Sequence, residues 1–387
     1  MRIKPEGWIA ILFVVGLAIA IITHPPEFLT PQTELRGVWL TNIDSEVLFS
    51  GRKLRKSLKR LARLNFNTVY PTVWTRGHTL YPSKVAESVF GVSLDPEPGL
   101  RKRDILEEIV TQGHKEGLTV IPWFEFGFVI PANSPIVQLH PDWLTNRQDG
   151  GQTVYRKEKE IVWLNPFHPQ VQQFITVIFA EIVANYDIDG IQLDDNFGVP
   201  VDMGYDPYTL ALYRSEHQGN SPPPNFRDQE WMAWRSEKLT QLVTRLFHTV
   251  KALKPDCLIG LSPNSQHFSY NNYLQDWQTW EERGLIDELI LQVYWDDLER
   301  FRYELKLPEV KAARERIPVG IGILTGLRKR FVPMSQVQAQ VEIVRQENLA
   351  GVAFFFYETL AGRDHELKKL FSIPAVRPDW GARKMGR

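Results

Sequence analysis

Short apolar segments alternate with segments of helical spacing along most of the chain, and this alternation most constrains the fold. Eight segments are rich in Val, Ile or aromatic residues and are bounded by Gly, Pro, Asn or Asp, as buried β-strands are. They are residues 35–42, 66–74, 118–126, 190–195, 257–264, 289–295, 319–325 and 351–357. Such nearly continuous apolar strands are typical of a parallel sheet that is covered on both faces.

The segments between these strands have the spacing of amphipathic helices. In residues 53–64, Leu54, Leu58 and Leu61 form one apolar stripe, and basic residues occupy the opposite, solvated face. The other helical segments are residues 103–116, 171–186, 231–253, 271–283, 298–314, 335–347 and 362–371. Eight strand-helix units predict an α/β fold, a single (β/α)8 TIM barrel over residues 35–372.

Two long connections interrupt the regular alternation. Residues 129–167 separate the third strand from its helix, and residues 196–229 separate the fourth strand from its helix. The loops that follow strands build the active sites of such barrels. Because loops of this length inside a compact domain usually carry function, we expect both to border the site.

The amino-terminal segment has the composition of an export signal. Arg2 and Lys4 precede an uncharged apolar run over residues 8–22, which is shorter than a comfortable bilayer span and holds small residues at 18–20. Export to the periplasm or the extracellular space is therefore expected. The predicted organisation is a signal peptide or membrane anchor helix (1–24), a linker (25–34), the barrel (35–372) and a loosely held basic tail (373–387).

Charge and cysteine content exclude several classes of partner and cofactor. Lys and Arg number 45 and Asp and Glu number 46, so no global field favours nucleic acid or an anionic membrane surface. The single Cys257 excludes a disulfide framework and a multi-thiolate metal site. We expect a neutral polymer as the partner, no nucleic acid, no cofactor or metal, and membrane contact only through the amino-terminal segment.

Residues 189–195, Asp-Gly-Ile-Gln-Leu-Asp-Asp, end the fourth strand on two adjacent carboxylates. Successive side chains of a strand point to opposite faces. Ile191 and Leu193 therefore face the helices, whereas Gln192 and Asp194 face the barrel interior. This parity places Asp194 at the rim, and it leaves the direction of Asp195 open. Such an acid pair is also compatible with a helix cap or a divalent-cation site.

Other strand ends bring polar and aromatic side chains to the same rim. Gln292, Tyr294 and Asp296 share one parity in the sixth strand, and Glu125 shares a face with Trp123 in the third. The candidate catalytic residues are Asp194, Asp195, Glu125 and Asp296, and the candidate substrate-binding residues are Trp74, Arg76, Trp123, Asn196, Asn264, Gln292, Tyr294, Trp295 and Tyr357.

Converging carboxylates with aromatic walls are what glycoside hydrolysis requires. One carboxylic acid protonates the leaving oxygen, while a second carboxylate attacks the sugar or activates water. Aromatic faces stack on the C–H faces of sugar rings, although for each aromatic residue alone core packing is the more common explanation. The sequence contains no His-Glu-x-x-His, no Gly-x-Ser-x-Gly and no phosphate-binding loop. The candidates therefore favour carboxylate chemistry on a polysaccharide.

Six segments follow one another in an order that carries a family pattern. They are residues 35–41 (LRGVWLT), 66–70 (FNTVY), 120–124 (VIPWF), 163–166 (WLNP), 189–195 (DGIQLDD) and 292–295 (QVYW). In this order they resemble the glycosyl-hydrolase-like family 10 proteins, over about residues 35–371. The resemblance implies a distant relationship to α-amylase-type barrels, in which the Asp that ends strand four is the nucleophile, and Asp194 matches that position. It also implies export in bacteria and action on envelope polysaccharide, particularly peptidoglycan glycan strands without stem peptides.

The sequence departs from that pattern in ways that bear on the proton donor. Amylase-type barrels carry their general acid at the end of strand five, where this chain has Ser262-Pro263-Asn264. The donor is therefore open between Asp195, Glu125 and Asp296, and Glu125 stands where relatives tend to have Asn. The sequence predicts an exported glycoside hydrolase centred on Asp194, with a non-catalytic glycan-binding barrel at the cell envelope as the alternative.

Overall fold

The computed structural model describes residues 32–156 and 159–379 of the chain. The expected signal peptide or anchor at residues 1–24 lies outside the described residues, as do residues 380–387. Across the described ranges, no helix combines the length and the apolar character needed to cross a membrane.

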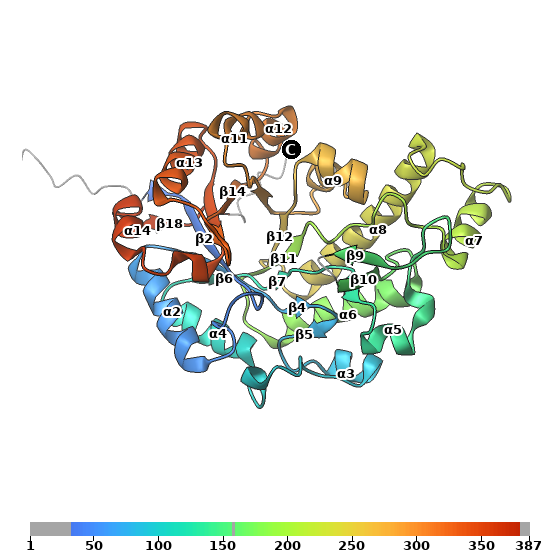
Figure 1. Cartoon of the computed structure of the whole chain (residues 1–387), viewed down its shortest axis with the longest axis horizontal. Helices are drawn as coiled ribbons and strands as arrows, with labels where there is room; N and C mark the ends of the chain where they lie inside the picture. The colour runs from blue at the N-terminus through green and yellow to red at the C-terminus, as the bar shows by residue number, and fades with distance from the viewer. Residues whose placement is uncertain (1–31, 157–158, 380–387) are drawn as a thin grey trace, which may run out of the picture. The chain divides into compact units, whose positions relative to one another are not determined.

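Parallel strands form one large sheet at all eight predicted positions, and the barrel prediction is confirmed (Figure 1). In sheet order the strands are β6 (Thr119–Val120), β3 (Thr68–Pro71), β2 (Leu35–Leu40), β17 (Gly351–Phe355), β14 (Val319–Leu324), β13 (Glu288–Gln292), β12 (Leu258–Ser262), β11 (Gly190–Asp194) and β7 (Trp123–Phe124). The two ends of this order, β6 and β7, are consecutive pieces of one segment, residues 119–124. The sheet therefore closes into a barrel. Because β6 and β7 together occupy one position, the nine strands fill eight positions around it.

Residues 119–124 close the barrel because their backbone bonds to a strand on each side. The N–H of Ile121 donates to the carbonyl of Val69 at 3.0 Å, and the carbonyl of Pro122 accepts from the N–H of Gln192 at 2.8 Å. A proline has no N–H with which to continue a ladder. The segment 119–124 is consequently divided into two short strands around Pro122, although it remains hydrogen-bonded to a strand on each side.

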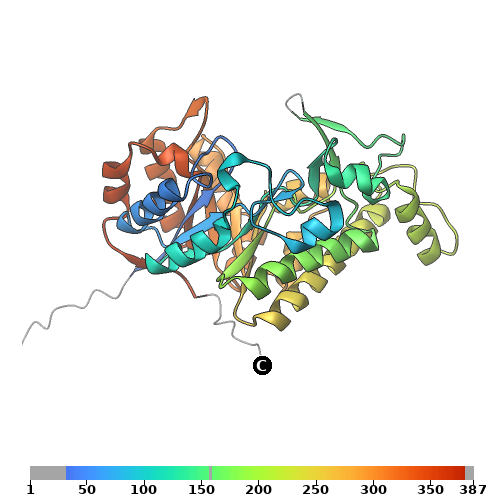
Figure 2. The same cartoon turned by 90° about the horizontal axis from the view of Figure 1, so that it is seen from below.

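Helices connect the strands and cover the outside of the barrel (Figure 1). They are α2 (Gly51–Arg63), α4 (Ile105–Lys115), α6 (Pro169–Asn185), α8 (Gln229–Leu253), α10 (Trp277–Glu282), α11 (Leu298–Leu305), α12 (Pro308–Arg314), α13 (Met334–Gln346) and α14 (Asp364–Leu370). The two longest, α6 and α8, pack side by side (Figure 2).

Two of the predicted helices are each divided in the structure. The segment predicted as one helix over 271–283 contains the end of α9 (Gln266–Tyr273) and all of α10, because Leu274 adopts a left-handed conformation with φ 54°. The segment over 298–314 is divided between α11 and α12, because Pro308 cannot continue a helix and instead begins a new one.

The two long connections fold into additional elements. Residues 129–163 form a small antiparallel sheet of β8 (Val129–Pro131), β10 (Lys159–Trp163) and β9 (Val154–Arg156), together with α5 (Pro135–Leu139). The second connection carries α7 (Pro207–Glu216). The two pack together, since the N–H of Gly204 donates to the carbonyl of Asn146 at 3.0 Å and the Thr145 hydroxyl donates to Asp206 at 3.2 Å. The remaining short elements are α3 (Lys84–Phe90), β1 (Gln32–Thr33), β4 (Trp74–Thr75), β5 (His78–Thr79), β15 (Gly326–Leu327), β16 (Arg330–Phe331) and β18 (Ala375–Val376).

Strand parity separates two apolar cores. Ile191 and Leu193 belong to the large core between the strands and the surrounding helices. The barrel interior holds a second, mostly aromatic and aliphatic cluster that includes Trp39, whose indole N–H donates to the Gln192 side-chain oxygen at 2.9 Å. The predicted directions of the β11 side chains are thus confirmed.

The carboxyl-terminal segment closes the amino-terminal end of the barrel. Arg377 is buried, donates to the Thr68 hydroxyl at 3.0 Å and forms an ion pair with Glu288. Glu288 also accepts from the Tyr70 hydroxyl at 3.0 Å inside the barrel. The described part of the expected tail is therefore held by buried polar contacts.

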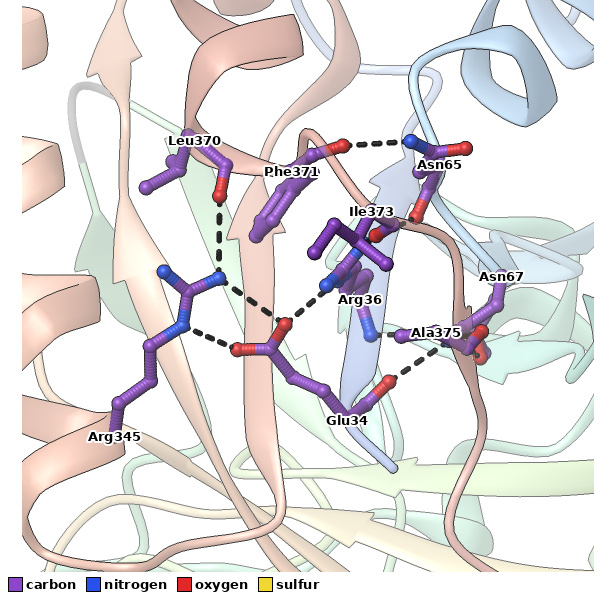
Figure 3. Close-up of polar contacts among 10 residues, drawn as sticks. Glu34, Arg36, Asn65, Asn67, Arg345, Leu370, Phe371, Ile373 and Ala375 are labelled. Atoms are coloured by element: carbon purple, nitrogen blue, oxygen red, sulfur yellow. Dashed lines mark hydrogen bonds and ion pairs between the residues drawn. The ribbon is translucent and has the colours of Figure 1, made fainter. Parts of the chain in front are cut away.

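A buried glutamate joins the first strand to the last helices (Figure 3). Glu34 is 4% exposed, and its carboxylate accepts from the Nε of Arg36 at 2.6 Å and from the Nε of Arg345 at 2.7 Å. The same two arginines donate to backbone carbonyls of the carboxyl-terminal segment, Arg36 to Ile373 at 2.6 Å and Arg345 to Leu370 at 3.2 Å. One carboxylate thus orients two arginines that bind the backbone of residues 370–373 beside β2.

Replacing Glu34 by Ala is expected to lower the free energy of unfolding by about 3 kcal/mol, because removing one partner leaves a buried charge uncompensated. Urea unfolding measures this effect. The matched control is Glu237→Ala, which breaks an exposed pair with Arg283 and is expected to change stability by less than about 1 kcal/mol. Equal effects of the two substitutions would contradict the structural role given to Glu34.

Candidate active site

A cavity of about 160 Å³ lies at the carboxyl ends of the barrel strands. Three of the four predicted catalytic carboxylates line it together with amide and aromatic side chains. Its lining residues are Trp39, Trp123, Glu125, Phe126, Asp194, Asp195, Asn196, Gln292, Tyr294 and Phe355. Acidic, amide and aromatic side chains from five different strand positions of the barrel therefore line one small cavity.

Asp194 is the last residue of β11 and is 3% exposed. Its Oδ1 accepts from the Gln292 amide at 2.8 Å, and its Oδ2 accepts from the Asn196 amide at 3.4 Å. The buried amide of Gln275 donates to the Asp194 backbone carbonyl at 2.9 Å. The side chain is therefore fixed in direction by amide donors on both carboxylate oxygens.

Asp195 enters the same cavity from the loop that follows β11. Its Oδ2 accepts from the Asn264 amide at 3.0 Å, and its Oδ1 accepts from the Asn196 amide at 3.1 Å. The Asn196 nitrogen thus lies within 3.4 Å of both aspartates, and it also donates to the Glu125 backbone carbonyl at 3.0 Å. The loop sets the direction that strand parity left open.

Glu125 follows β7 and is 7% exposed. Its Oε2 accepts from the hydroxyls of Thr72 at 3.0 Å and Thr41 at 3.3 Å. Burial raises the pKa of Glu125 to about 7, against the opposing effects of the two threonines and of the Arg76 charge. A carboxyl group with this pKa is half protonated near neutral pH.

Burial also raises the pKa of Asp194 well above its usual value. The charge of Asp195, a side-chain hydrogen bond with Asp195 and the charge of Glu125 raise it further. Like charges in one dry cavity cannot all be present at once. These shifts favour a protonated carboxyl group in the cluster near neutral pH.

Four predicted site residues line neither this cavity nor the cleft beside it. One is Arg76, whose charge opposes the rise that burial causes in the pKa of Glu125, and the other three are Asp296, Trp74 and Tyr357. Asp296 is exposed and pairs with Arg330, because β13 ends at Gln292 and strand alternation does not extend to residue 296. Trp74 is buried, and its indole donates to the Gly127 carbonyl at 2.8 Å. Tyr357 lines a different hollow beside α2. These three do not join the carboxylate cavity.

Sequence reasoning missed several residues that shape the site. Trp39 and Phe355 supply part of the cavity wall, and Thr41 and Thr72 hold the Glu125 carboxyl group. The alternation that selects Asp194 also selects the threonines, since Thr41 has the parity of Trp39 and Thr72 that of Tyr70. A threonine in a strand does not by itself indicate a catalytic site, because its hydroxyl becomes relevant only when a carboxylate is known to lie beside it.

A larger cleft of about 590 Å³ adjoins the carboxylate cavity. Gln292 and Tyr294 line both spaces, so the cleft and the cavity are neighbours that share these two side chains. The remaining lining residues of the cleft are Asn264, Ser265, His267, Phe268, Leu291, Val293, Trp295, Arg300 and Glu304. Exposed rings next to hydrogen-bonding groups are suited to sugar units on one side of the carboxylates.

Metal ligation has no support in the part of the chain that the structure describes. Over residues 32–156 and 159–379, no three His, Cys, Asp or Glu side chains are grouped to hold a metal ion.

Solved structures share this fold at low sequence identity. The PgaB (BpsB) glycoside hydrolase domain from Bordetella bronchiseptica is 15% identical, with a TM-score of 0.65 over 90% of this chain and 100% of that chain. TtGalA, an α-galactosidase from Thermus thermophilus, is 14% identical, with a TM-score of 0.52 over 90% of this chain and 66% of that chain. Both likenesses concern the fold.

Sequence comparisons identify closer relatives. Glycosyl hydrolase DigH of Escherichia coli strain K12 is 28% identical over 430 aligned residues, which cover 94% of this chain and 92% of that protein. Glycosyl hydrolase YngK of Bacillus subtilis is 26% identical, over 73% of this chain and 59% of that protein. The family model described as glycosyl hydrolase-like 10 matches residues 34–343. The chain therefore belongs to the glycosyl hydrolase-like 10 family.

Proposed function

We propose that this protein is an exported glycoside hydrolase that acts on an envelope polysaccharide, in particular on peptidoglycan glycan strands that lack stem peptides. The convergence of Asp194, Asp195 and Glu125 in one aromatic-walled cavity carries the proposal. Family membership supports a glycan as the substrate class. The apolar run over residues 8–22 supports export and leaves open cleavage or retention of that segment.

Asp194 is the carboxylate on which the proposed reaction is centred. Amide N–H groups only donate, so the donors from Gln292 and Asn196 favour its ionised form and fix its orientation. From the rim of β11 it can attack the anomeric carbon or stabilise positive charge that develops there. The position it shares by resemblance with the nucleophile of amylase-type barrels supports this role.

Glu125 is the proposed proton donor. Its partners, Thr41 and Thr72, are hydroxyl groups, which accept a hydrogen bond as readily as they donate one. A protonated Glu125 therefore keeps its partners, whereas Asp195, held by the amides of Asn264 and Asn196, would lose one. Asp194 and Asp195 also share a side-chain hydrogen bond, which can hold a second proton. The proton for the leaving oxygen is proposed to come from Glu125.

The alternative function is a non-catalytic glycan-binding barrel at the cell envelope. It is favoured by the end of β12, where Ser262 pairs with Asp194 in register and supplies no acid. Glu125 provides a carboxyl group to the same cavity from the opposite neighbour of β11. Hydrolysis is therefore the function that the geometry supports best.

Asp194→Asn is expected to reduce cleavage of purified, peptide-free glycan strands at least about a thousandfold, because the neutral amide can neither attack nor stabilise the cationic transition state. Release of reducing ends, followed by chromatography, measures the rate. Asp296→Asn serves as the matched control and is expected to retain nearly wild-type activity, because Asp296 lies outside the cavity. Equal activity of Asp194→Asn and wild type would exclude the assignment.

The rate is expected to fall as the pH rises above about 7, because Glu125 must be protonated to act as the donor and its pKa is about 7. Glu125→Gln is expected to slow glycan cleavage about a hundredfold or more. The same variant should still cleave an aryl glycoside whose leaving group needs no proton. A variant that loses both activities equally would argue against the proton-donor role.

Glu125→Gln is also expected to stabilise the fold at pH 8. The pKa of Glu125 rises from 4.5 to about 7 on folding, so the folded state binds the extra proton and wild-type stability declines as the pH increases from about 4.5 to 7. A neutral isostere avoids this decline, which amounts to at most about 3 kcal/mol. Urea unfolding of both proteins at pH 5 and pH 8 checks the sign: a stability difference that does not grow with pH would disagree with a buried, neutral Glu125.

A further inference from the structure

The cleft beside the carboxylate cavity contains a cation in an unusual setting. Arg300 lines this cleft, which shares the side chains of Gln292 and Tyr294 with the cavity. Asn264, whose amide donates to Asp195, belongs to the same lining. A ligand in the cleft would therefore lie directly beside the proposed site of bond cleavage.

Arg300 stacks on an exposed tryptophan. The centre of its guanidinium lies 3.4 Å from the centroid of the Trp295 ring, and Trp295 is 38% exposed. Stacking occupies the flat face of the guanidinium and leaves the N–H groups at its edge available in the ring plane. The pair thus combines an aromatic ring on which a sugar can stack with guanidinium N–H groups that are held in a fixed orientation.

No carboxylate of the described chain forms an ion pair with Arg300. Glu304 lies one turn later in α11 and lines the same cleft. Burial raises the pKa of Glu304 and the charge of Arg300 acts to lower it, but the guanidinium lies on Trp295 and the two groups form no ion pair. The other neighbouring acids are engaged, since Asp296 pairs with Arg330 and Asp297 accepts from the Arg300 backbone N–H at 2.6 Å. Among the described residues, Arg300 thus interacts with Glu304 only through its charge, and no ion pair occupies the donor edge of its guanidinium.

Helix stability does not explain a cation at this position. Arg300 is the third residue of α11, which Asp297 caps. The amino-terminal end of a helix carries partial positive charge and favours acids over bases. An arginine there opposes the helix dipole, so its presence is better explained by what it binds.

We propose that this cleft binds the sugar adjacent to the cleaved bond and that Arg300, stacked on Trp295, pairs with a carboxylate on that sugar. This inference rests on the proposed function and narrows its substrate. In peptidoglycan the matching group is the lactyl carboxylate, which is free only after the stem peptide has been removed. Arg300 then selects peptide-free strands, and the locally anionic ligand differs from the neutral polymer expected from overall charge.

Equilibrium binding tests the proposal without requiring turnover. The full chain carrying Asp194→Asn, with and without Arg300→Gln, is titrated calorimetrically with a peptide-free glycan oligosaccharide and with the same oligosaccharide after reduction of its carboxylates to alcohols. Carboxylate reduction is expected to weaken binding about tenfold when Arg300 is present and less than about twofold when it is absent. Arg300→Lys should give an intermediate preference because it keeps the charge and loses the fixed orientation of the N–H groups.

The matched control is Arg302→Gln, on the same helix, where the native arginine pairs with Glu347 at 2.9 Å outside the cleft. This variant should keep the full preference for the carboxylate. Equal binding of the two oligosaccharides by the protein with Arg300, or an undiminished preference after Arg300→Gln, would overturn the proposal. A uronic acid oligosaccharide is titrated in the same way. If it binds as tightly as the peptide-free glycan oligosaccharide, the carboxylate that Arg300 recognises is that of a uronic acid.

The glycoside hydrolase proposal and the proposal for Arg300 can be contradicted independently of each other. A wild-type protein that cleaves no glycan but binds with the Arg300-dependent preference would support the carboxylate site and contradict the hydrolase. A protein that cleaves intact and carboxyl-reduced strands equally would support the hydrolase and contradict the role of Arg300.

Discussion

The backbone bonds that residues 119–124 make to a strand on each side determine where the site can form. They close the sheet, and they also fix the register of β7 against β11, in which Gln192 is opposite Trp123 and Leu193 is opposite Phe124. The next residues along the two strands are Asp194 and Glu125. Closure of the barrel therefore brings two carboxyl groups to the same level of the rim, and the loop after β11 adds Asp195 beside them.

Such a cluster is unfavourable by itself, because burial and mutual repulsion both penalise the charged forms. The protein offsets this penalty with two different sets of donors. The amides of Gln292, Asn196 and Asn264 surround the aspartates, whereas threonine hydroxyls hold Glu125. In the proposed mechanism, this difference in hydrogen-bonding chemistry favours the ionised form of Asp194 and the protonated form of Glu125. The cleft with Trp295 and Arg300 then extends the site toward the polymer.

The sequence predicts those features that depend on local periodicity. Strand alternation places Asp194 inside the barrel and Ile191 outside it, and the structure has both arrangements. Features set by loops escape this reasoning, because a loop has no period: Asp195 turns inward, while Asp296, beyond the end of β13, turns out to Arg330. The division of α9 from α10 depends on one left-handed residue, Leu274, for which no Gly or Asn marks the position. The threonines around Glu125 become meaningful only when the fold brings them to it.

Infrared difference titration can determine which carboxyl group of the cavity holds the proton near neutral pH. A protonated carboxyl group absorbs at a higher frequency than a carboxylate, so wild type, Glu125→Gln and Asp194→Asn can be compared between pH 5 and 9. If Glu125 holds this proton, a carboxyl band titrates near pH 7 in wild type, persists in Asp194→Asn and disappears in Glu125→Gln. A band that persists in Glu125→Gln and disappears in Asp194→Asn would place the proton on Asp194 and contradict the account.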